Sequence, residues 1–295
     1  MRPCAVIDHT LWIGNNFQGV FSLPNLVNVS NIYIGDAFYD DQTQTIASGT
    51  LTGVSFPALK KASEILAVNV GSINLIDVPN LVDGYRITLS GLPALTNFSL
   101  SSNYAGSYIN ITNSAITEFS YGGSSLSGIT LTSNPSLEKV TVSDDSAIGA
   151  LAVDCGGMVT SRSSFGYKTT RRAAQHAMPR FTGPKDISSF EVRYCKQPSG
   201  DWKTALASVG SIKAYSMKFH ENEFINLSLP NLKNISSSLQ ILKNDNLTEI
   251  AFPSLTTIGE LTITDNPSLL YINATAFPVL TSINYTSSFD GAFKA

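Results

Sequence analysis

The sequence has little of what catalytic, metal-binding and membrane-spanning proteins depend on. Only 14% of its 295 residues are charged, and it contains three cysteines, three histidines and two tryptophans. No apolar run reaches the roughly 18 residues that a membrane-spanning helix requires. The net charge of −3 provides no broad cationic face, so we expect no nucleic-acid partner.

The few histidines and cysteines predict neither a metal site nor a cofactor site. His9, His176 and His220 form no cluster of ligands, and no Cys-x-x-Cys pair is present. Gly-x-Ser-x-Gly, phosphate-loop and dinucleotide-binding motifs are also missing from the sequence. We therefore expect no cofactor, no metal and no catalytic residues.

What the sequence does contain is one short pattern, written out nearly three times between Ser228 and Ile283. Each copy opens with a four-residue phrase that has Pro in its second position and Leu in its fourth. The prolines are 23 and then 25 residues apart; the phrases are Leu229–Leu232, Phe252–Leu255 and Phe277–Leu280. A period of 20 to 30 residues is typical of a solenoid, whose coils stack because none buries enough apolar surface alone.

Each copy also contains a strand and a bend. Leu261 and Ile263 alternate with threonines, which predicts a strand with one buried face. An Asn closes the strand pattern, and its side chain can bond the backbone of an adjacent coil. These structural asparagines are Asn134, Asn244 and Asn266. The sequence thus predicts a mainly β, parallel solenoid with one strand per coil, as in leucine-rich repeats.

The repeats are interrupted in the middle of the chain. Residues 158–203 carry nine of the nineteen basic residues and show neither strand alternation nor a helical stripe. We interpret this stretch as a surface excursion or as translated sequence foreign to the fold, such as a retained intron. The alternative is a basic patch that contacts an acidic polymer. The predicted organisation is a ragged N-terminus at 1–10, a first solenoid at 11–145, an irregular basic insertion at 146–208 and a second solenoid at 209–295.

Three phrases carry a resemblance to a known family: Phe252–Gly259, Leu261–Leu269 and Gly128–Leu137. They resemble the fungal cell-wall organisation proteins of the extracellular-mutant and sporulation-specific family. The resemblance covers residues 11–142 and 210–289 and is best in the second stretch. It implies a right-handed β-helix of the receptor L-domain type. It also implies secretion, N-glycosylation, a glycolipid (GPI) anchor and a role in cell-wall integrity.

The targeting signals point in two directions. Met1–His9 lacks the apolar core of a signal peptide, and Phe289–Ala295 lacks the hydrophobic tail of an anchor signal. Taken literally, these ends predict a cytosolic chain. Yet the sequence carries eight Asn-x-Ser/Thr glycosylation sequons, at Asn28, Asn97, Asn110, Asn226, Asn234, Asn246, Asn273 and Asn284. We interpret the chain as a fragment or truncated gene model of a secreted protein, which reaches a membrane only through an anchor missing here.

The expected function is that of a non-catalytic secreted glycoprotein that supports the fungal cell wall as a repeat scaffold. Its expected partners are cell-wall polysaccharide or other wall proteins. One alternative is a receptor-like ligand-binding module. The cysteines leave a choice between a Cys155–Cys195 disulfide, with Cys4 left over, and three unpaired thiols.

The second alternative is a polysaccharide lyase or hydrolase, because β-helices also carry such enzymes. These need carboxylates that converge on one face. The candidates are Asp40, Asp41, Glu138, Asp144, Asp145 and Asp265. None recurs in register with another, so we interpret them as solvated turn carboxylates. Tyr121, Tyr33 and Tyr39 are candidates for stacking on sugar rings, with isolated surface or core tyrosines as the simpler interpretation.

Overall fold

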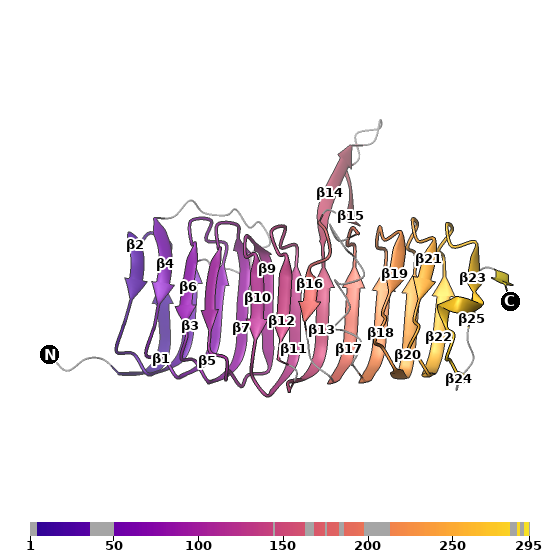
Figure 1. The fold of residues 1–295 in the computed structure, drawn as a ribbon. Coiled ribbons are helices and arrows are strands. Elements are labelled where there is room, and N and C mark those ends of the chain that lie inside the picture. The colour runs from indigo at the N-terminus through magenta and orange to yellow at the C-terminus, as the bar shows by residue number, and fades with distance from the viewer. Residues whose placement is uncertain are drawn as a thin grey trace. The chain divides into compact units, whose positions relative to one another are not determined.

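The computed structural model describes residues 5–35, 50–143, 145–162, 168–174, 176–182, 186–197, 213–283, 288–289 and 292–294. The chain divides into two compact units, Met1–Ala147 and Ile148–Ala295, called here unit 1 and unit 2. Nearly all the described elements are strands, and the long sheets are parallel (Figure 1). The predicted mainly β, parallel solenoid is confirmed. Within the described residues, no helix has the length and apolar character needed to cross a membrane.

The main sheet of unit 1 takes one strand from each coil. Each of these strands pairs in parallel with its neighbours. In order across the sheet they are β1 (Val6–Ile13), β3 (Asn28–Gly35), β5 (Lys61–Val68), β7 (Asp83–Leu92), β9 (Tyr108–Ser114) and β11 (Ser125–Thr132).

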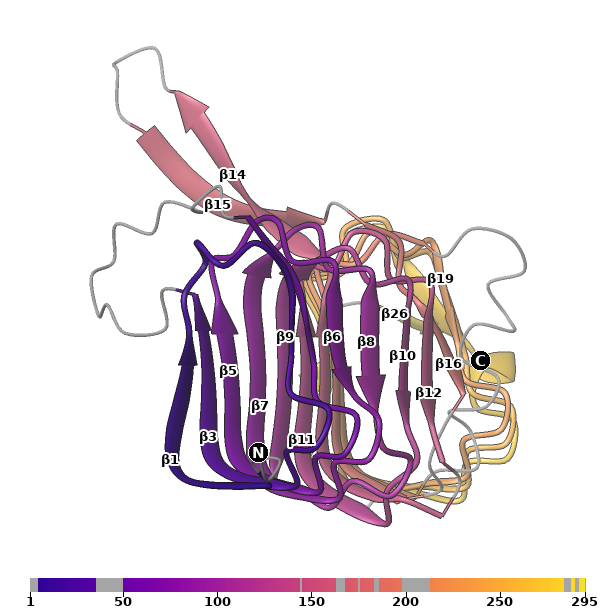
Figure 2. The same cartoon turned by 90° about the vertical axis from the view of Figure 1, so that its left-hand side faces the viewer.

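Shorter strands form the opposite wall of the coils in unit 1, as Figure 2 shows. They too pair in parallel. One group is β2 (Gly19–Ser22), β4 (Leu51–Ser55), β6 (Leu75–Val78) and β8 (Asn97–Leu100), and the other is β10 (Glu118–Tyr121) with β12 (Lys139–Val142).

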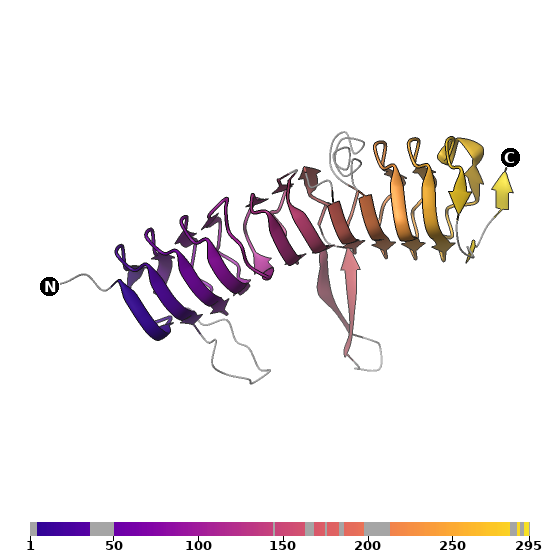
Figure 3. The ribbon, with the colours of Figure 1, turned by 90° about the horizontal axis from the view of Figure 1, so that it is seen from below.

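Unit 2 repeats this plan, and Figure 3 shows the coils of each unit from below. Its main strands are β13 (Ala147–Asp154), β17 (Asp186–Arg193), β18 (Lys213–His220), β20 (Asn234–Leu242), β22 (Thr257–Thr264), β24 (Ser282–Ile283) and β25 (Ser288–Phe289). Its shorter elements are β16 (Arg180–Thr182), β19 (Asn226–Ser228), β21 (Glu249–Ala251), β23 (Tyr271–Asn273), β26 (Ala292–Lys294) and the 3-10 helix η2 (Ala274–Ala276). An antiparallel hairpin, β14 (Gly156–Arg162) and β15 (Lys168–Ala174), projects from the strands of this unit (Figure 1).

The core consists of columns of equivalent side chains, one from each coil. In unit 2, Leu239 lies in register with Met217 on one side and Leu261 on the other, and all three are fully buried. In unit 1, Ile65 and Ile87 are paired in the same way. Burial of each side chain contributes about 1.5–3 kcal/mol, but only when the neighbouring coils cover it.

The Pro-containing phrases close each coil as turns. The N–H of Leu232 donates to the carbonyl of Leu229 at 3.3 Å, and that of Leu255 donates to Phe252 at 3.2 Å. Pro occupies the second position of both turns, where its fixed φ is already suitable and its missing N–H is not needed. The repeated phrase therefore marks where the chain changes direction.

The structure corrects the prediction of an irregular insertion at residues 146–208. β13 and β17 are regular strands, and β17 pairs in parallel with β18. The reason lies in the core: Ile187, Phe190 and Val192 have the same spacing as the buried residues of β18, and all three are buried. In these columns Phe, Met and Ala replace the usual Leu and Ile, so the repeat could not be recognised from its Leu and Ile pattern.

The structure also bears on the predicted N-terminus and on the end of the predicted insertion. The N-terminus predicted to be ragged at 1–10 contains the start of β1, in which Val6 pairs with Asn28 of β3. Residues 198–212, which hold the end of the predicted insertion and the start of the predicted second solenoid, lie outside the described part of the chain.

Candidate functional site

The outer face of the main sheet in unit 1 carries two neighbouring aromatic side chains. Trp12 and Tyr33 occupy register-paired positions on β1 and β3, each placed next to residues that point into the core. Their ring centroids are 4.7 Å apart and the planes meet at 84°, an edge-to-face arrangement. Trp12 remains 42% exposed. This pair begins a row of surface side chains that continues across the sheet.

A hydrogen bond and an ion pair continue the row. The hydroxyl of Tyr33 donates to Oε2 of Glu64 on β5 at 2.9 Å. Arg86 Nη1, on β7, lies 3.8 Å from Oε1 of the same carboxylate. The hydrogen bond to Glu64 is the main cause that raises the pKa of Tyr33 above its usual value, with burial and the negative charge of Glu64 adding to it. Tyr33 therefore stays protonated and remains a donor to Glu64.

Two more tyrosines complete the row. The guanidinium of Arg86 lies over the ring of Tyr85, 5.6 Å from the centroid, and Tyr85 lies edge-to-face with Tyr108 of β9 at 6.1 Å. Tyr85 is 51% exposed and Tyr108 is 46% exposed. We call this continuous set the aromatic row; it consists of Trp12, Tyr33, Glu64, Tyr85, Arg86 and Tyr108.

The charges of the aromatic row balance. Glu64 and Arg86 carry opposite charges, and beside them Lys61 pairs with Asp83 at 2.8 Å. Both partners of the second pair are more than half exposed, so it contributes little to stability. The row therefore offers hydrogen-bond donors and acceptors between aromatic rings, and the charges of these two ion pairs sum to zero.

The acids considered from the sequence lie either at exposed positions or outside the described residues. Glu138 and Asp145 lie in exposed positions next to strands of unit 1, and Asp265 lies at an exposed bend of unit 2. Asp40, Asp41 and Asp144 are outside the described residues. Across the described part of the chain, no group of three His, Cys, Asp or Glu side chains could hold a metal ion.

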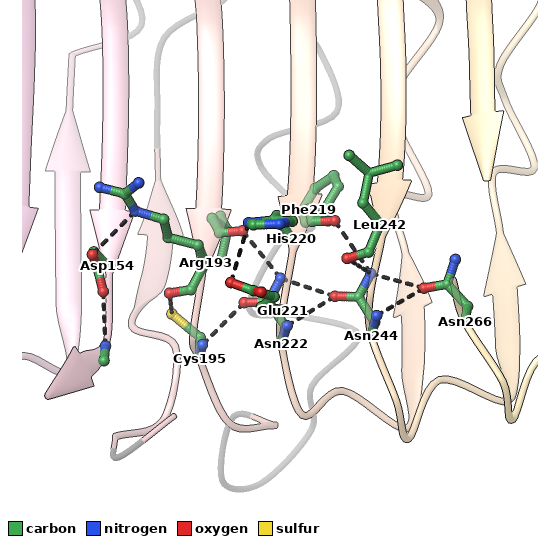
Figure 4. Close-up of polar contacts among 12 residues, drawn as sticks. Asp154, Arg193, Cys195, Phe219, His220, Glu221, Asn222, Leu242, Asn244 and Asn266 are labelled. Atoms are coloured by element: carbon green, nitrogen blue, oxygen red, sulfur yellow. Dashed lines mark hydrogen bonds and ion pairs between the residues drawn. The ribbon is translucent and has the colours of Figure 1, made fainter. Parts of the chain in front are cut away.

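Inside unit 2, a ladder of asparagines joins successive coils (Figure 4). The Oδ1 of Asn244 accepts hydrogen bonds from the backbone N–H and the side-chain amide of Asn222, at 3.0 and 3.1 Å. Asn266 accepts the same two bonds from Asn244, both at 3.0 Å. The amide of Asn244 also donates to the carbonyl of Phe219 at 3.2 Å. These buried amides satisfy backbone groups that a bend leaves without strand partners.

The bend before each ladder residue has the same conformation. Glu221, Lys243 and Asp265 each have φ between 54° and 57° and directly precede the ladder asparagines. A left-handed backbone is unfavourable for such residues, and the ladder bonds hold it in place. In unit 1, Ser133 has the same conformation before Asn134, whose Oδ1 accepts from the N–H of Ser114 at 3.0 Å.

At the N-terminal end of the ladder in unit 2, a disulfide-bonded cysteine takes the place of an asparagine. The N–H of Cys195 donates to Oδ1 of Asn222 at 3.0 Å, so Cys195 occupies the position that an asparagine has in later coils. Its sulfur is bonded to that of Cys155 at 2.04 Å. Nearby, the buried carboxylate of Asp154 accepts hydrogen bonds from Arg193 Nε and from the N–H of Gly156 (Figure 4). The disulfide and the asparagine ladder therefore both stabilise the fold.

The glycosylation sequons are distributed over both units. The described side chains among them are exposed or half-buried: Asn28, Asn97, Asn110, Asn226, Asn234 and Asn246. Asn273 is the last residue of β23, but its side chain is not among those described. Asn284 lies outside the described residues. Asn110 is on the same strand and face as the aromatic row, next to Tyr108.

Of the tyrosines considered for sugar stacking, one belongs to the aromatic row. Tyr33 is part of it, while Tyr39 lies outside the described residues. Tyr121 is buried, and its hydroxyl lies 2.7 Å from the carbonyl of Ser125, to which it donates. The other members of the row were not predicted from the sequence: Trp12, Glu64, Tyr85, Arg86 and Tyr108. Trp12 and Tyr108 lie beside buried isoleucines, a position that could have identified both as outward-facing aromatics.

The comparisons with known proteins give a partial relationship. No protein-family model matches the chain. It is 42% identical over 80 residues to sporulation-specific protein 22 of Saccharomyces cerevisiae, a match that covers 27% of this chain and 17% of that protein. It is 36% identical over 89 residues to sporulation-specific protein 2 of the same yeast, covering 30% of this chain and 17% of that protein. The similarity is thus to fungal sporulation-specific proteins, over less than a fifth of the length of each.

Proposed function

We propose that this protein is a non-catalytic, secreted glycoprotein that supports the organisation of a fungal cell wall, with its β-solenoid units as a scaffold. The observation that carries the proposal is the similarity to two sporulation-specific yeast proteins in a chain built of stacked parallel coils. A wall made during sporulation is a setting in which such a scaffold would act. The outer face of the protein is the proposed contact with wall polysaccharide or with other wall proteins.

Two features support secretion. A disulfide between Cys155 and Cys195 is the form expected in an oxidising compartment, because cytosolic thiols are kept reduced. Six sequon asparagines have exposed or half-buried side chains, as an N-linked glycan requires. Attachment to the outer face of the plasma membrane through a glycolipid anchor is part of the same proposal.

The test is deletion of the gene in the organism that carries it. We expect vegetative cells or spores without the gene to become more sensitive to wall-binding dyes and to wall-degrading glucanase. Reintroducing the gene should restore resistance. Unchanged sensitivity in both cell types would contradict the proposal.

Two biochemical measurements separate this proposal from the alternatives. The protein secreted by its own host should lose mass when N-glycans are removed enzymatically. Incubation of the purified protein with wall polysaccharides should release no new reducing ends. Release of sugar would instead support a lyase or hydrolase, and would contradict a purely structural role.

A further inference from the structure

We propose that the aromatic row of unit 1 is the surface that binds polysaccharide, and that its ligand is a neutral, extended chain. This inference rests on the proposed function, since a wall scaffold must contact a wall polymer. It adds the position of the contact and the chemical class of the ligand.

The exposed rings provide the apolar part of the surface. Trp12, Tyr85 and Tyr108 are each more than two-fifths exposed, although burial of an aromatic ring is strongly favourable. Continuous exposed apolar groups in a soluble protein commonly mark an interaction site. Sugar rings present C–H groups on their faces, and these pack well against aromatic rings. Aromatic side chains linked by edge-to-face contacts form a firm platform for such packing.

The polar part of the surface suits hydroxyl groups. Glu64 is an acceptor and Arg86 is a donor, and a guanidinium has more N–H groups than its contact with Glu64 can use. Tyr33 donates a hydrogen bond to Glu64, which joins the aromatic part of the row to its polar part. A sugar hydroxyl both donates and accepts, and can therefore bond to either type of group.

The charge balance selects a neutral ligand. The two ion pairs on this face, Glu64 with Arg86 and Lys61 with Asp83, sum to zero. An acidic or basic polymer would gain no net attraction and would have to compete with these pairs. The binding of a neutral polysaccharide does not depend on net electrostatic attraction and is therefore not weakened by this arrangement.

The shape of the surface suits a polymer. The row crosses β1, β3, β5, β7 and β9, which places its ends about 19 Å apart at the usual spacing between strands. Small molecules bind in concave pockets that bury most of their surface. An extended chain can lie along an open face and make one contact per strand, so several weak contacts add together.

Unit 2 provides an internal comparison. The positions that correspond to Trp12 and Tyr33, between the last two core residues of each strand, carry Glu191, Lys218, Gln240 and Thr262. Those that correspond to Glu64, Arg86 and Tyr108 carry Ser189, Ser216, Ser238 and Glu260. These polar side chains form no aromatic row, although β18 also carries Tyr215, which is 61% exposed. The difference between the units lies in the outer residues, because both have the same core pattern.

The experiment is co-sedimentation of the full chain with insoluble β-1,3-glucan and with chitin, at low and at high salt. The variants are Trp12→Ala with Tyr108→Ala, and Tyr215→Ala as the matched control on unit 2. We expect wild type and Tyr215→Ala to bind at least one polysaccharide equally well at both salt concentrations. The double variant should bind about tenfold more weakly, equivalent to about 1.4 kcal/mol.

The milder pair Trp12→Phe and Tyr108→Phe guards against loss of folding. It should keep most of the binding, and all variants should show the wild-type far-ultraviolet circular dichroism. The inference is overturned if wild type binds neither polymer, if Tyr215→Ala loses as much binding as the double variant, or if high salt abolishes binding. A failure here with a clear wall defect in the deletion strain would remove this inference and leave the proposed function standing.

Discussion

Tyr33 and Glu64 are 31 residues apart in the sequence, yet the phenol of one donates a 2.9 Å hydrogen bond to the carboxylate of the other. The contact exists because β3 and β5 are neighbours in the parallel sheet, where Tyr33 is paired with Leu66 and Glu64 lies diagonally, two residues before that partner. It joins the aromatic and the charged parts of the aromatic row. The chemistry of this surface therefore depends on how the coils stack, and on no local motif.

This contact predicts a shifted titration of Tyr33. Its pKa lies above the usual value of 10, first because of the hydrogen bond to Glu64. Since the folded state favours the neutral phenol, the resulting stability is present below pH 10 and is lost as pH rises through the higher folded pKa. Glu64→Gln removes the negative charge and should bring the pKa of Tyr33 down. NMR titration of labelled tyrosine carbons measures this, and Asp83→Asn, which alters the neighbouring ion pair, should have little effect.

Two buried tyrosines of unit 1 should respond differently when their hydroxyls are removed. Tyr121 donates to a backbone carbonyl, whereas the hydroxyl of Tyr104 has no hydrogen-bond partner among the described residues. Tyr121→Phe should lower the free energy of unfolding by about 1–2 kcal/mol, and Tyr104→Phe should leave it unchanged or raise it slightly. Urea unfolding measures both variants. Equal losses would mean that the hydroxyl of Tyr104 is bonded.

The asparagine ladder predicts a large local effect in unit 2. Asn244 accepts from Asn222 and donates to Phe219 and Asn266, all inside the unit. Asn244→Ala leaves several buried groups unpaired and should lower the free energy of unfolding by at least about 2 kcal/mol. The exposed neighbour Asp245 is the control, since Asp245→Ala should change it by less than about 0.5 kcal/mol. Similar losses in the two variants would rule out a structural role for the ladder.

The disulfide predicts a redox-dependent stability. Cys155 and Cys195 are 40 residues apart, and closing a loop of this length stabilises the fold by about 3 to 4 kcal/mol in the chain-entropy description. The double variant Cys155→Ser and Cys195→Ser should lose this amount in urea unfolding. A reducing agent should destabilise the wild type but not the variant. Insensitivity of the wild type to reduction would show that the bond is unimportant or not formed.

The sequence predicted the stacked architecture because the core positions repeat. Leu239 and Leu261 fall in one buried column, as the alternation with polar residues indicates. The Pro-containing phrases become turns, and Asn134, Asn244 and Asn266 lie at the bends. These features repeat because every coil has to satisfy the same demands of burial and backbone hydrogen bonding.

The aromatic row escaped prediction for the opposite reason. The outward position that holds Glu64 on β5 holds Arg86 on β7 and Tyr108 on β9. A search for what repeats therefore ignores the positions at which the coils differ. The differing side chains can be placed next to one another only when the register between strands is known. The register depends on loop lengths that vary from coil to coil.

The stacked fold is tested most directly by whether equivalent residues of successive coils lie side by side. Ser216 and Ser238 are register partners on β18 and β20, with their hydroxyl oxygens 3.3 Å apart. In a Cys4→Ser background, Ser216→Cys with Ser238→Cys should form a disulfide on mild oxidation, seen by peptide mass spectrometry. Ser216→Cys with Glu260→Cys, two strands apart at about 10 Å, should not. Cross-linking of the second pair, or of neither, would contradict the stacked register on which the fold and the proposed binding surface depend.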